Sequence, residues 1–220
     1  MQVGDIFQEY EDLVKQVDNL FIRVKSGFPD EIRCAKGCSD CCYALFDLSL
    51  IEAVYLNRAF LDNFDFGAAR SAILDAAAQA DRTATRHKRD FYNMTKQGTS
   101  DEEILALASK VRIRCPLLGF DNSCRLYAHR PITCRLYGVP NTIQGKSYVC
   151  GLCTFKPGQS YPTFAQDRIQ DKLADFSRRL AQTLDSRFSQ LGAVYVPVSM
   201  ALITRYDDNY LGVGKSEEQA

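Results

Sequence analysis

The sequence predicts a mainly α-helical fold with minor β content: a helical single domain that carries a cysteine-rich, partly β knuckle. Apolar residues recur at steps of three and four along most of the 220 residues, which is the spacing of one helix face. Residues 111–160 break this pattern with five cysteines and four prolines. No repeat or low-complexity linker divides the chain, so we expect one domain over residues 1–212 and a disordered tail over 213–220.

Two helices are expected in the N-terminal part of the chain. Residues 5–26 place their apolar side chains on one face, and Gly27 ends this helix. Ser49 is followed three residues later by Glu52. This pair forms a capping box, which predicts that a second helix starts there and continues to about residue 61.

Two more helices are expected before residue 111. Residues 67–96 are rich in alanine, with apolar side chains along one side. We interpret them as one long helix, which the β-branched residues near 83–85 could kink or break. Ser100 with Glu103 repeats the capping box and opens a short helix to about residue 110.

The cysteine-rich knuckle is expected to combine short strands with turns. Strands are predicted at residues 111–118, 124–127 and 142–150, and Pro131 is expected to start a helical turn.

The last long helix is expected over residues 163–191. Thr163 with Gln166 would cap its start, and Gly192 would end it. A helix of that length measures about 40 Å and would pack along the first helix. The apolar stretch 194–204 is expected to fold back on the core.

Composition and charge exclude several classes of protein. Lys+Arg and Asp+Glu balance at 27 each, whereas nucleic-acid binders usually carry a basic excess. We see no signal peptide at the N-terminus and no run of about 18 apolar residues, so no membrane partner is expected. We therefore expect a cytoplasmic protein, in which free thiols stay reduced unless they are ligated.

Four of the nine cysteines lie within nine residues. Thiols at such short spacing, in a reducing compartment, indicate metal ligands before they indicate disulfides. Gly37 lies inside this run and allows the sharp turn that brings sulfurs together. The four are Cys34, Cys38, Cys41 and Cys42.

A second set of cysteines follows at Cys115, Cys124 and Cys134, and then the pair Cys150 and Cys153. The pair has ligand spacing, but C-x-x-C also serves as a dithiol redox pair, so its role stays open. One centre takes four protein ligands, so nine thiols could supply two centres.

Cys41 and Cys42 are direct neighbours, and neighbouring side chains diverge on a regular backbone. We therefore do not expect them to bind the same metal ion. Five arginines accompany the second set and would stabilise the negative charge of metal-bound thiolates. They are Arg112, Arg114, Arg125, Arg130 and Arg135.

The spacing favours an iron–sulfur cluster, of the 4Fe-4S type, over zinc. Zinc ribbons pair one C-x-x-C with another, whereas here a three-cysteine loop combines with single, widely spaced cysteines. Zinc stays the alternative.

The motif C-x3-C-x2-C-C at Cys34–Cys42 is followed by C-P-L-L from Cys115, C-R-L-Y from Cys124, and R-P-x2-C-R around Cys134. In these motifs, over residues 34–138, the chain resembles the YkgJ-like cysteine-cluster family, described as zinc- or iron-chelating domains. The resemblance implies metal binding, with no defined cellular role. The ligands that it implies are Cys34, Cys38, Cys41, Cys42, Cys115, Cys124 and Cys134.

Enzymes form the alternative class. The flagellin lysine N-methylases are similar through the same cysteine motif, but they are longer, and their activity does not carry over. Cys34-x3-Cys38-x2-Cys41 also has the spacing of radical S-adenosylmethionine enzymes. Asp40 stands where those enzymes have an aromatic residue, and no glycine-rich strand motif follows. Two hypotheses result: a redox or structural metal module, and a metalloenzyme with an open cluster position.

Overall fold

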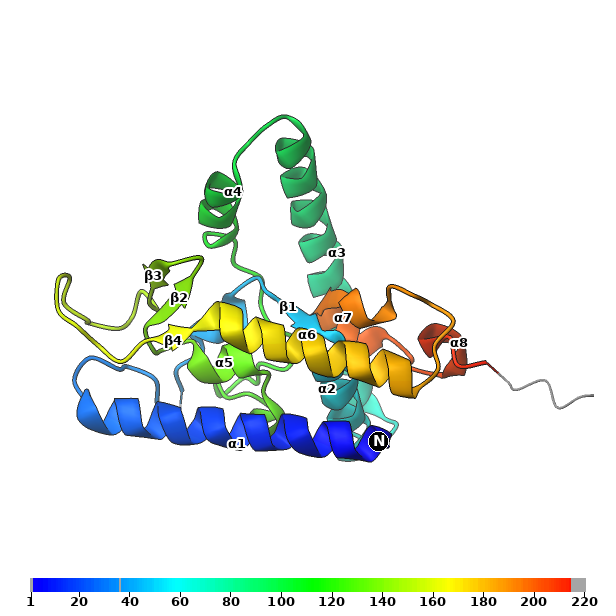
Figure 1. Cartoon of the computed structure of the whole chain (residues 1–220). Helices are drawn as coiled ribbons and strands as arrows, with labels where there is room; N and C mark the ends of the chain where they lie inside the picture. The colour runs from blue at the N-terminus through cyan, green and yellow to red at the C-terminus, as the bar shows by residue number, and fades with distance from the viewer. Residues whose placement is uncertain (1, 36, 215–220) are drawn as a thin grey trace, which may run out of the picture.

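A computed structural model describes residues 2–35 and 37–214. Over this range the chain has eight α-helices and two small sheets, which confirms the mainly α-helical prediction (Figure 1). The helices are α1 (Val3–Gly27), α2 (Leu50–Asn63), α3 (Ala68–Lys96), α4 (Asp101–Ala108), α5 (Ile132–Leu136), α6 (Gln166–Thr183), α7 (Val198–Ile203) and α8 (Asp208–Leu211).

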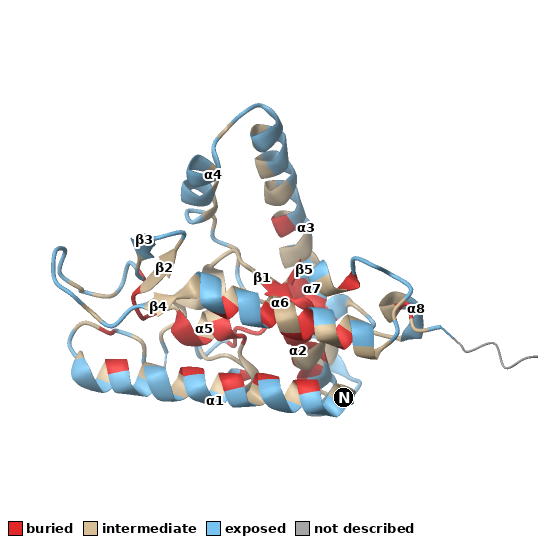
Figure 2. Ribbon diagram, viewed as in Figure 1, coloured by how far each residue is buried: buried red, intermediate tan, exposed pale blue. Residues whose placement is uncertain are grey.

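The helical body consists of α1, α2 and α6, which pack around a common core (Figure 2). The steps of three and four noted above place the apolar side chains of α1 on the face that meets α6. On the outer side of this contact, the guanidinium of Arg179 donates hydrogen bonds to both carboxylate oxygens of Glu9. The centre of this core contains Ile6, Tyr10, Leu50, Ile51, Leu173 and Leu180.

A second core lies on the other side of α2, against α3 and α7. Strands β1 (Asp47–Ser49) and β5 (Tyr195–Pro197) form an antiparallel pair beside it, with Leu48 opposite Val196. Leu117 and Leu126 from the cysteine-rich knuckle are buried in the same core. The predicted return of residues 194–204 to the core is confirmed.

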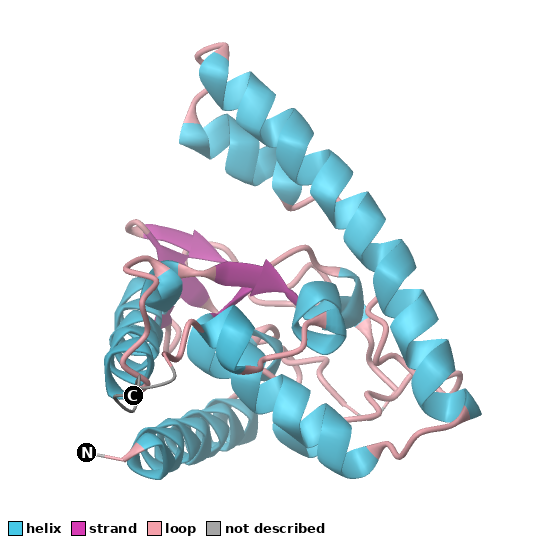
Figure 3. Cartoon of the chain, turned by 90° about the vertical axis from the view of Figure 1, so that its right-hand side faces the viewer, coloured by secondary structure: helices cyan, strands magenta, loops and turns pink. Residues whose placement is uncertain are grey.

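Helix α3 continues far beyond this core and, with α4, forms a hairpin that projects from the molecule (Figure 3). The helix is unbroken through residues 83–85, so the alternative of two helices is not found. The capping box that was predicted at α4 is present, since Ser100 and Glu103 exchange the expected hydrogen bonds.

In the cysteine-rich knuckle, the described residues form fewer strands than predicted. Residues 111–118 and 124–127 make only two single bridges, Ala44 with Arg112 and Leu118 with Cys124. Within 142–150 a hairpin does form, and its first strand also pairs in parallel with a short strand before α6. These strands are β2 (Asn141–Ile143), β3 (Lys146–Tyr148) and β4 (Phe164–Ala165).

The last long helix is shorter than predicted at both ends. The residues before Gln166 belong to β4, and the hydroxyl of Thr163 bonds to the carbonyl of Tyr161 instead of capping the helix. At the other end Asp185 adopts a left-handed conformation, with φ of 50°, which stops the helix after Thr183.

Gly192 has a different role from the predicted helix end. A Cβ atom there would lie 2.8 Å from the Cα of Arg178, so glycine lets the returning chain pack directly on α6.

The C-terminal prediction is tested only in part. Val213 bridges Ser186, so residue 213 is ordered against the body, and residues 215–220 of the predicted tail lie outside the described range. Across the described residues, no helix is both long and apolar enough to cross a membrane.

Candidate metal centre

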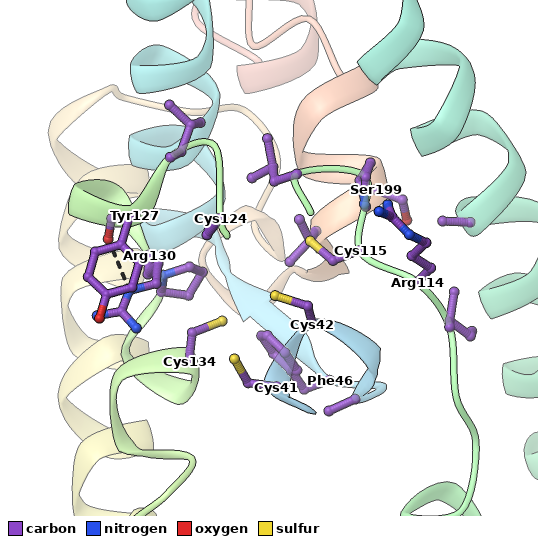
Figure 4. Close-up of a pocket in the computed structure, with 18 of the residues that line it drawn as sticks. Cys41, Cys42, Phe46, Arg114, Cys115, Cys124, Tyr127, Arg130, Cys134 and Ser199 are labelled. Atoms are coloured by element: carbon purple, nitrogen blue, oxygen red, sulfur yellow. Dashed lines mark hydrogen bonds between the residues drawn. The ribbon is translucent and has the colours of Figure 1, made fainter. Parts of the chain in front are cut away.

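Six of the seven cysteines predicted as ligands line one cavity of about 460 Å³. They come from parts of the chain about a hundred residues apart, and Figure 4 shows five of them around the cavity. The seventh, Cys34, lies against Gly138 and Cys153 instead. The six are Cys38, Cys41, Cys42, Cys115, Cys124 and Cys134.

Cys41 and Cys42 sit on a 3₁₀ turn, Asp40–Tyr43, and both side chains line the cavity. Their sulfurs are hydrogen-bonded to each other. Consecutive residues of a 3₁₀ turn point about 120° apart, and the cavity is wide enough to border both side chains. That the two sulfurs do not bind the same metal ion stays a prediction.

Backbone hydrogen bonds fix this turn against the second set of cysteines. The carbonyl of Cys42 accepts the N–H of Cys115 (2.7 Å), and the carbonyl of Tyr43 accepts the N–H of Ile113 (3.0 Å). The bridge between Ala44 and Arg112 continues this pairing. The position of the first cysteine loop relative to Cys115 is thus set by the main chain.

Cys115 and Cys124 lie at the two ends of a tight hairpin-like loop. The N–H of Gly119 bonds to the carbonyl of Ser123 (2.8 Å). Each sulfur accepts a hydrogen bond from a backbone N–H two residues further on, at Leu117 and Leu126 respectively. Such N–H···S bonds stabilise thiolates and are typical of cysteine ligands.

Cys134 lies in the short helix α5, and Glu52 of α2 holds that helix in place. The side chain of Glu52 is 2% exposed, and its carboxylate accepts the N–H of Ile132 (3.0 Å) as well as that of Ser49. Burial raises the pKa of Glu52, and these N–H donors oppose the rise. The capping box predicted from sequence is confirmed, and its carboxylate has this second role, which the local spacing could not reveal.

Arg135 anchors the same region from the opposite side. Its guanidinium is buried, pairs with Asp18 of α1, and donates hydrogen bonds to the carbonyls of Ala128 and Arg130. Residues 128–135 are therefore attached to both α1 and α2.

Three of the thiols that line the cavity, Cys41, Cys42 and Cys134, are joined by hydrogen bonds that shift their pKa values. Hydrogen bonds from Cys134 and Cys42 lower the pKa of Cys41, and the charge of Arg130 adds to this effect. The same bonds raise the pKa values of Cys42 and Cys134. Burial raises the pKa of Cys115 to about 12. A metal would have to displace protons from most of these thiols, so its binding would strengthen with pH.

Of the five arginines expected beside the thiols, two line the cavity. Arg130 stacks on the ring of Tyr127 at 3.5 Å, and Arg114 donates to the carbonyls of Leu118 and Gly119. Arg112 pairs instead with Asp40, and Arg135 pairs with Asp18. Arg125 is exposed.

The wall opposite the sulfurs is mostly apolar. Small residues of α3, Ala80 and Ala84, line it together with Leu56 and Val198. Soft sulfur donors beside an apolar wall suit a soft transition metal or an iron–sulfur cluster, whose potential depends on solvent exposure. In the described part of the chain, no three side chains of His, Cys, Asp or Glu are arranged as ligands of a metal ion, so ligation requires the sulfurs to turn inward.

No family model, curated protein or solved structure matches this chain. The resemblance to the YkgJ-like family therefore stays a prediction based on the cysteine motifs.

Proposed function

We propose that the cavity binds an iron–sulfur cluster, with the 4Fe-4S type favoured and zinc as the alternative. The observation that carries this proposal is the meeting of thiols from four separate parts of the chain at one cavity. Cys115, Cys124 and Cys134 would supply three ligands, and Cys41 or Cys42 the fourth. The resemblance to the YkgJ-like family favours the same chemistry.

Two features favour a cluster over a single zinc ion. Four sulfurs around one zinc ion lie at about 2.3 Å from it, whereas these thiols line one side of a cavity of about 460 Å³. A cluster distributes its thiolates over several iron atoms, so ligands from widely spaced segments are easier to accommodate. When bound, such a cluster supplies one-electron redox chemistry.

The surrounding residues would tune the cluster. The N–H groups of Leu117 and Leu126 donate to two of the sulfurs, and Arg130 adds a positive charge. Both kinds of contact stabilise negative charge on sulfur. The alanines of α3 keep water from one side, which also affects the potential.

Anaerobic purification, followed by iron, sulfide and zinc analysis, tests the proposal. We expect about four iron and four sulfide per chain. Cys124→Ser and Cys134→Ser should each remove most of the iron. Cys153→Ser is the matched control, because Cys153 does not line the cavity, and it should retain iron. Wild-type protein without iron and sulfide would overturn the cluster, and one zinc bound through Cys124 and Cys134 would establish the alternative.

An enzyme with an open cluster position is the second candidate, because the cavity extends from the sulfurs to the apolar wall of α3 and leaves room for a small molecule. A radical S-adenosylmethionine site would need Cys34, Cys38 and Cys41 on one cluster. Cys34 lies against Gly138, so we do not propose that class. Electron paramagnetic resonance of the reduced protein should therefore be unchanged by S-adenosylmethionine, and a changed spectrum would contradict this exclusion.

A further inference from the structure

Three cysteines, Cys34, Cys150 and Cys153, do not line the cavity and lie in the region around Gly138. The sulfur of Cys34 lies so close to Gly138 that a Cβ atom there would be 2.1 Å from it. The sulfur of Cys153 would lie 3.9 Å from the same Cβ atom, and its thiol donates a hydrogen bond to the carbonyl of Gly138 (3.3 Å). Both sulfurs therefore lie over Gly138.

Cys150 and Cys153 form a turn of the kind that presents two sulfurs together. The N–H of Cys153 bonds to the carbonyl of Cys150 (3.0 Å), and the N–H of Leu152 donates to the sulfur of Cys150. This is the same N–H···S arrangement as at Cys115 and Cys124. The pair thus has the backbone of a ligand turn as well as its spacing.

This turn is docked on the chain that leads to Cys34. Both the N–H and the hydroxyl of Thr154 bond to carbonyls of that segment, at Glu31 and Asp30, each at 3.0 Å. From α1, the ammonium of Lys25 donates to the carbonyl of Cys34. The second turn and the first cysteine loop therefore face each other.

Cys34 and Cys38 make the other half of the group. The N–H of Cys38 bonds to the carbonyl of Ala35 (3.0 Å), and Gly37, with φ of 90°, completes the turn. Cys38 also borders the cavity, but five other thiols already face it.

We propose that Cys34, Cys38, Cys150 and Cys153, once their side chains turn toward one another, form a second metal site beside the cavity that binds one zinc ion. Two short-spaced cysteine pairs facing each other are the arrangement of structural zinc sites. The four thiols would release their protons to solvent as Zn²⁺ binds, and the ion would join α1, the first cysteine loop and the turn at Cys150.

The nearby charges fit this proposal. The thiol of Cys150 now donates to the carboxylate of Asp40 (3.3 Å), which also pairs with Arg112. With Cys150 bound as a thiolate, the carboxylate of Asp40 would lie beside a second negative charge, and its ion pair with Arg112 would offset that repulsion. Lys25 donates a hydrogen bond to the carbonyl of Cys34, so one further cation lies beside a centre of net charge −2.

Gly138 was not singled out in the sequence, and it offers a specific probe. Its backbone has no positive φ, so the chain conformation there does not require glycine. What requires glycine is the sulfur of Cys34, which a methyl group would displace. Gly138→Ala should therefore weaken zinc binding although it removes no ligand. Gly151→Ala is the matched control, because a Cβ atom at Gly151 would meet no atom within 4 Å.

The test measures zinc and iron in the same preparations of the full chain. We expect about one zinc per chain in the wild-type protein. Cys153→Ser and Cys150→Ser should lose that zinc and keep the iron. Cys134→Ser should show the reverse, so that failure of this site and failure of the cavity site are distinguishable.

A second readout protects against misfolded variants. Cobalt(II) added to the chelator-treated wild-type protein should give the absorption of a tetrahedral thiolate site. When this absorption is used to titrate the protein, Gly138→Ala should lower the affinity for cobalt by at least about tenfold. Zinc that stays in Cys153→Ser, or the absence of the cobalt band in the wild-type protein, would overturn the second site. A Cys34–Cys153 disulfide found by mass spectrometry after anaerobic purification would overturn it as well.

Discussion

In the helical body, the contacts between α1, α2 and α6 are made by side chains such as Ile6, Leu50 and Leu173, which expose none of their surface. In the cysteine-rich knuckle, residues 111–160, turns follow one another, and only a few apolar side chains, such as Leu117 and Ile132, enter the two cores. Polar contacts, Glu52 to Ile132 and Arg135 to Asp18, add to this attachment. The body thus supplies its own stability through apolar burial, whereas the knuckle combines a small apolar contribution with polar anchors and, in our proposal, with metal.

The largest effect should come from a change inside the body. Leu173→Ala removes a side chain that is fully buried between α6 and its neighbours. It should lower the free energy of unfolding by about 3 kcal/mol, measured by urea denaturation. Leu61→Ala, at a position that is 44% exposed, is the control and should change stability little. Equal losses in both variants would contradict the role assigned to this core.

The next largest effect should distinguish a glutamate that anchors another helix from one that only caps its own helix. The capping boxes at Ser49 and Ser100 have the same chemistry, but Glu52 is buried and holds α5, whereas Glu103 is exposed at α4. Glu52→Ala leaves buried N–H groups without an acceptor and should cost about 2 kcal/mol.

Glu103→Ala should cost much less, because water can replace the lost acceptor. Circular dichroism and urea denaturation of both variants provide the measurement. If the two losses were equal, Glu52 would be only a cap and the anchor to α5 would have no energetic weight.

A change of pH should act on the thiols of the metal-free chain. Burial raises the pKa values of Cys34, Cys115 and Cys150 from 9.0 to about 12. The unfolded chain then loses these protons at lower pH than the folded chain, so the free energy of unfolding falls as pH rises from 9 to about 12.

Urea denaturation of the chelator-treated protein across this range checks the sign. Cys115→Ser removes one of these groups and should flatten the decline, while tyrosine ionisation contributes equally to both proteins. A stability that rises over the same range would contradict the protonated state assigned to these thiols.

The smallest effect should come from removing one hydrogen bond, between Thr154 of the cysteine-rich knuckle and the segment that follows α1. Thr154→Val removes the hydroxyl that bonds to Asp30 and should lower stability by about 0.5 kcal/mol, while it speeds zinc loss to a chelator. Thr95→Val removes a similar bond within α3 and serves as the control, with no change in zinc loss. Identical zinc release from both variants would leave the second site without this support.

The sequence was most informative where structure depends on neighbours along the chain. The spacing in α1 and the capping boxes at Ser49 and Ser100 located three helices, because caps and helix faces are decided within a few residues. The predicted length of α6 was wrong. The apolar periodicity of the sequence does not reveal the pairing of β4 with β2 or the left-handed conformation of Asp185.

The candidate site divides in the same way. Short spacing identified the cysteines, but which of them face one another depends on contacts between distant segments. The separation of Cys34 from the cavity follows from Gly138 and the turn at Cys150, more than a hundred residues away. Likewise, only the fold brings Glu52 to the N–H of Ile132.

Helix α2 contributes to both cores: Leu50 and Ile51 belong to one, and Leu56 and Phe60 to the other. Neither core can lose this helix without exposing apolar surface of the other. The two halves of the molecule are therefore coupled through one shared element, and melting of the helical structure should be cooperative, with a single transition seen by every spectroscopic probe.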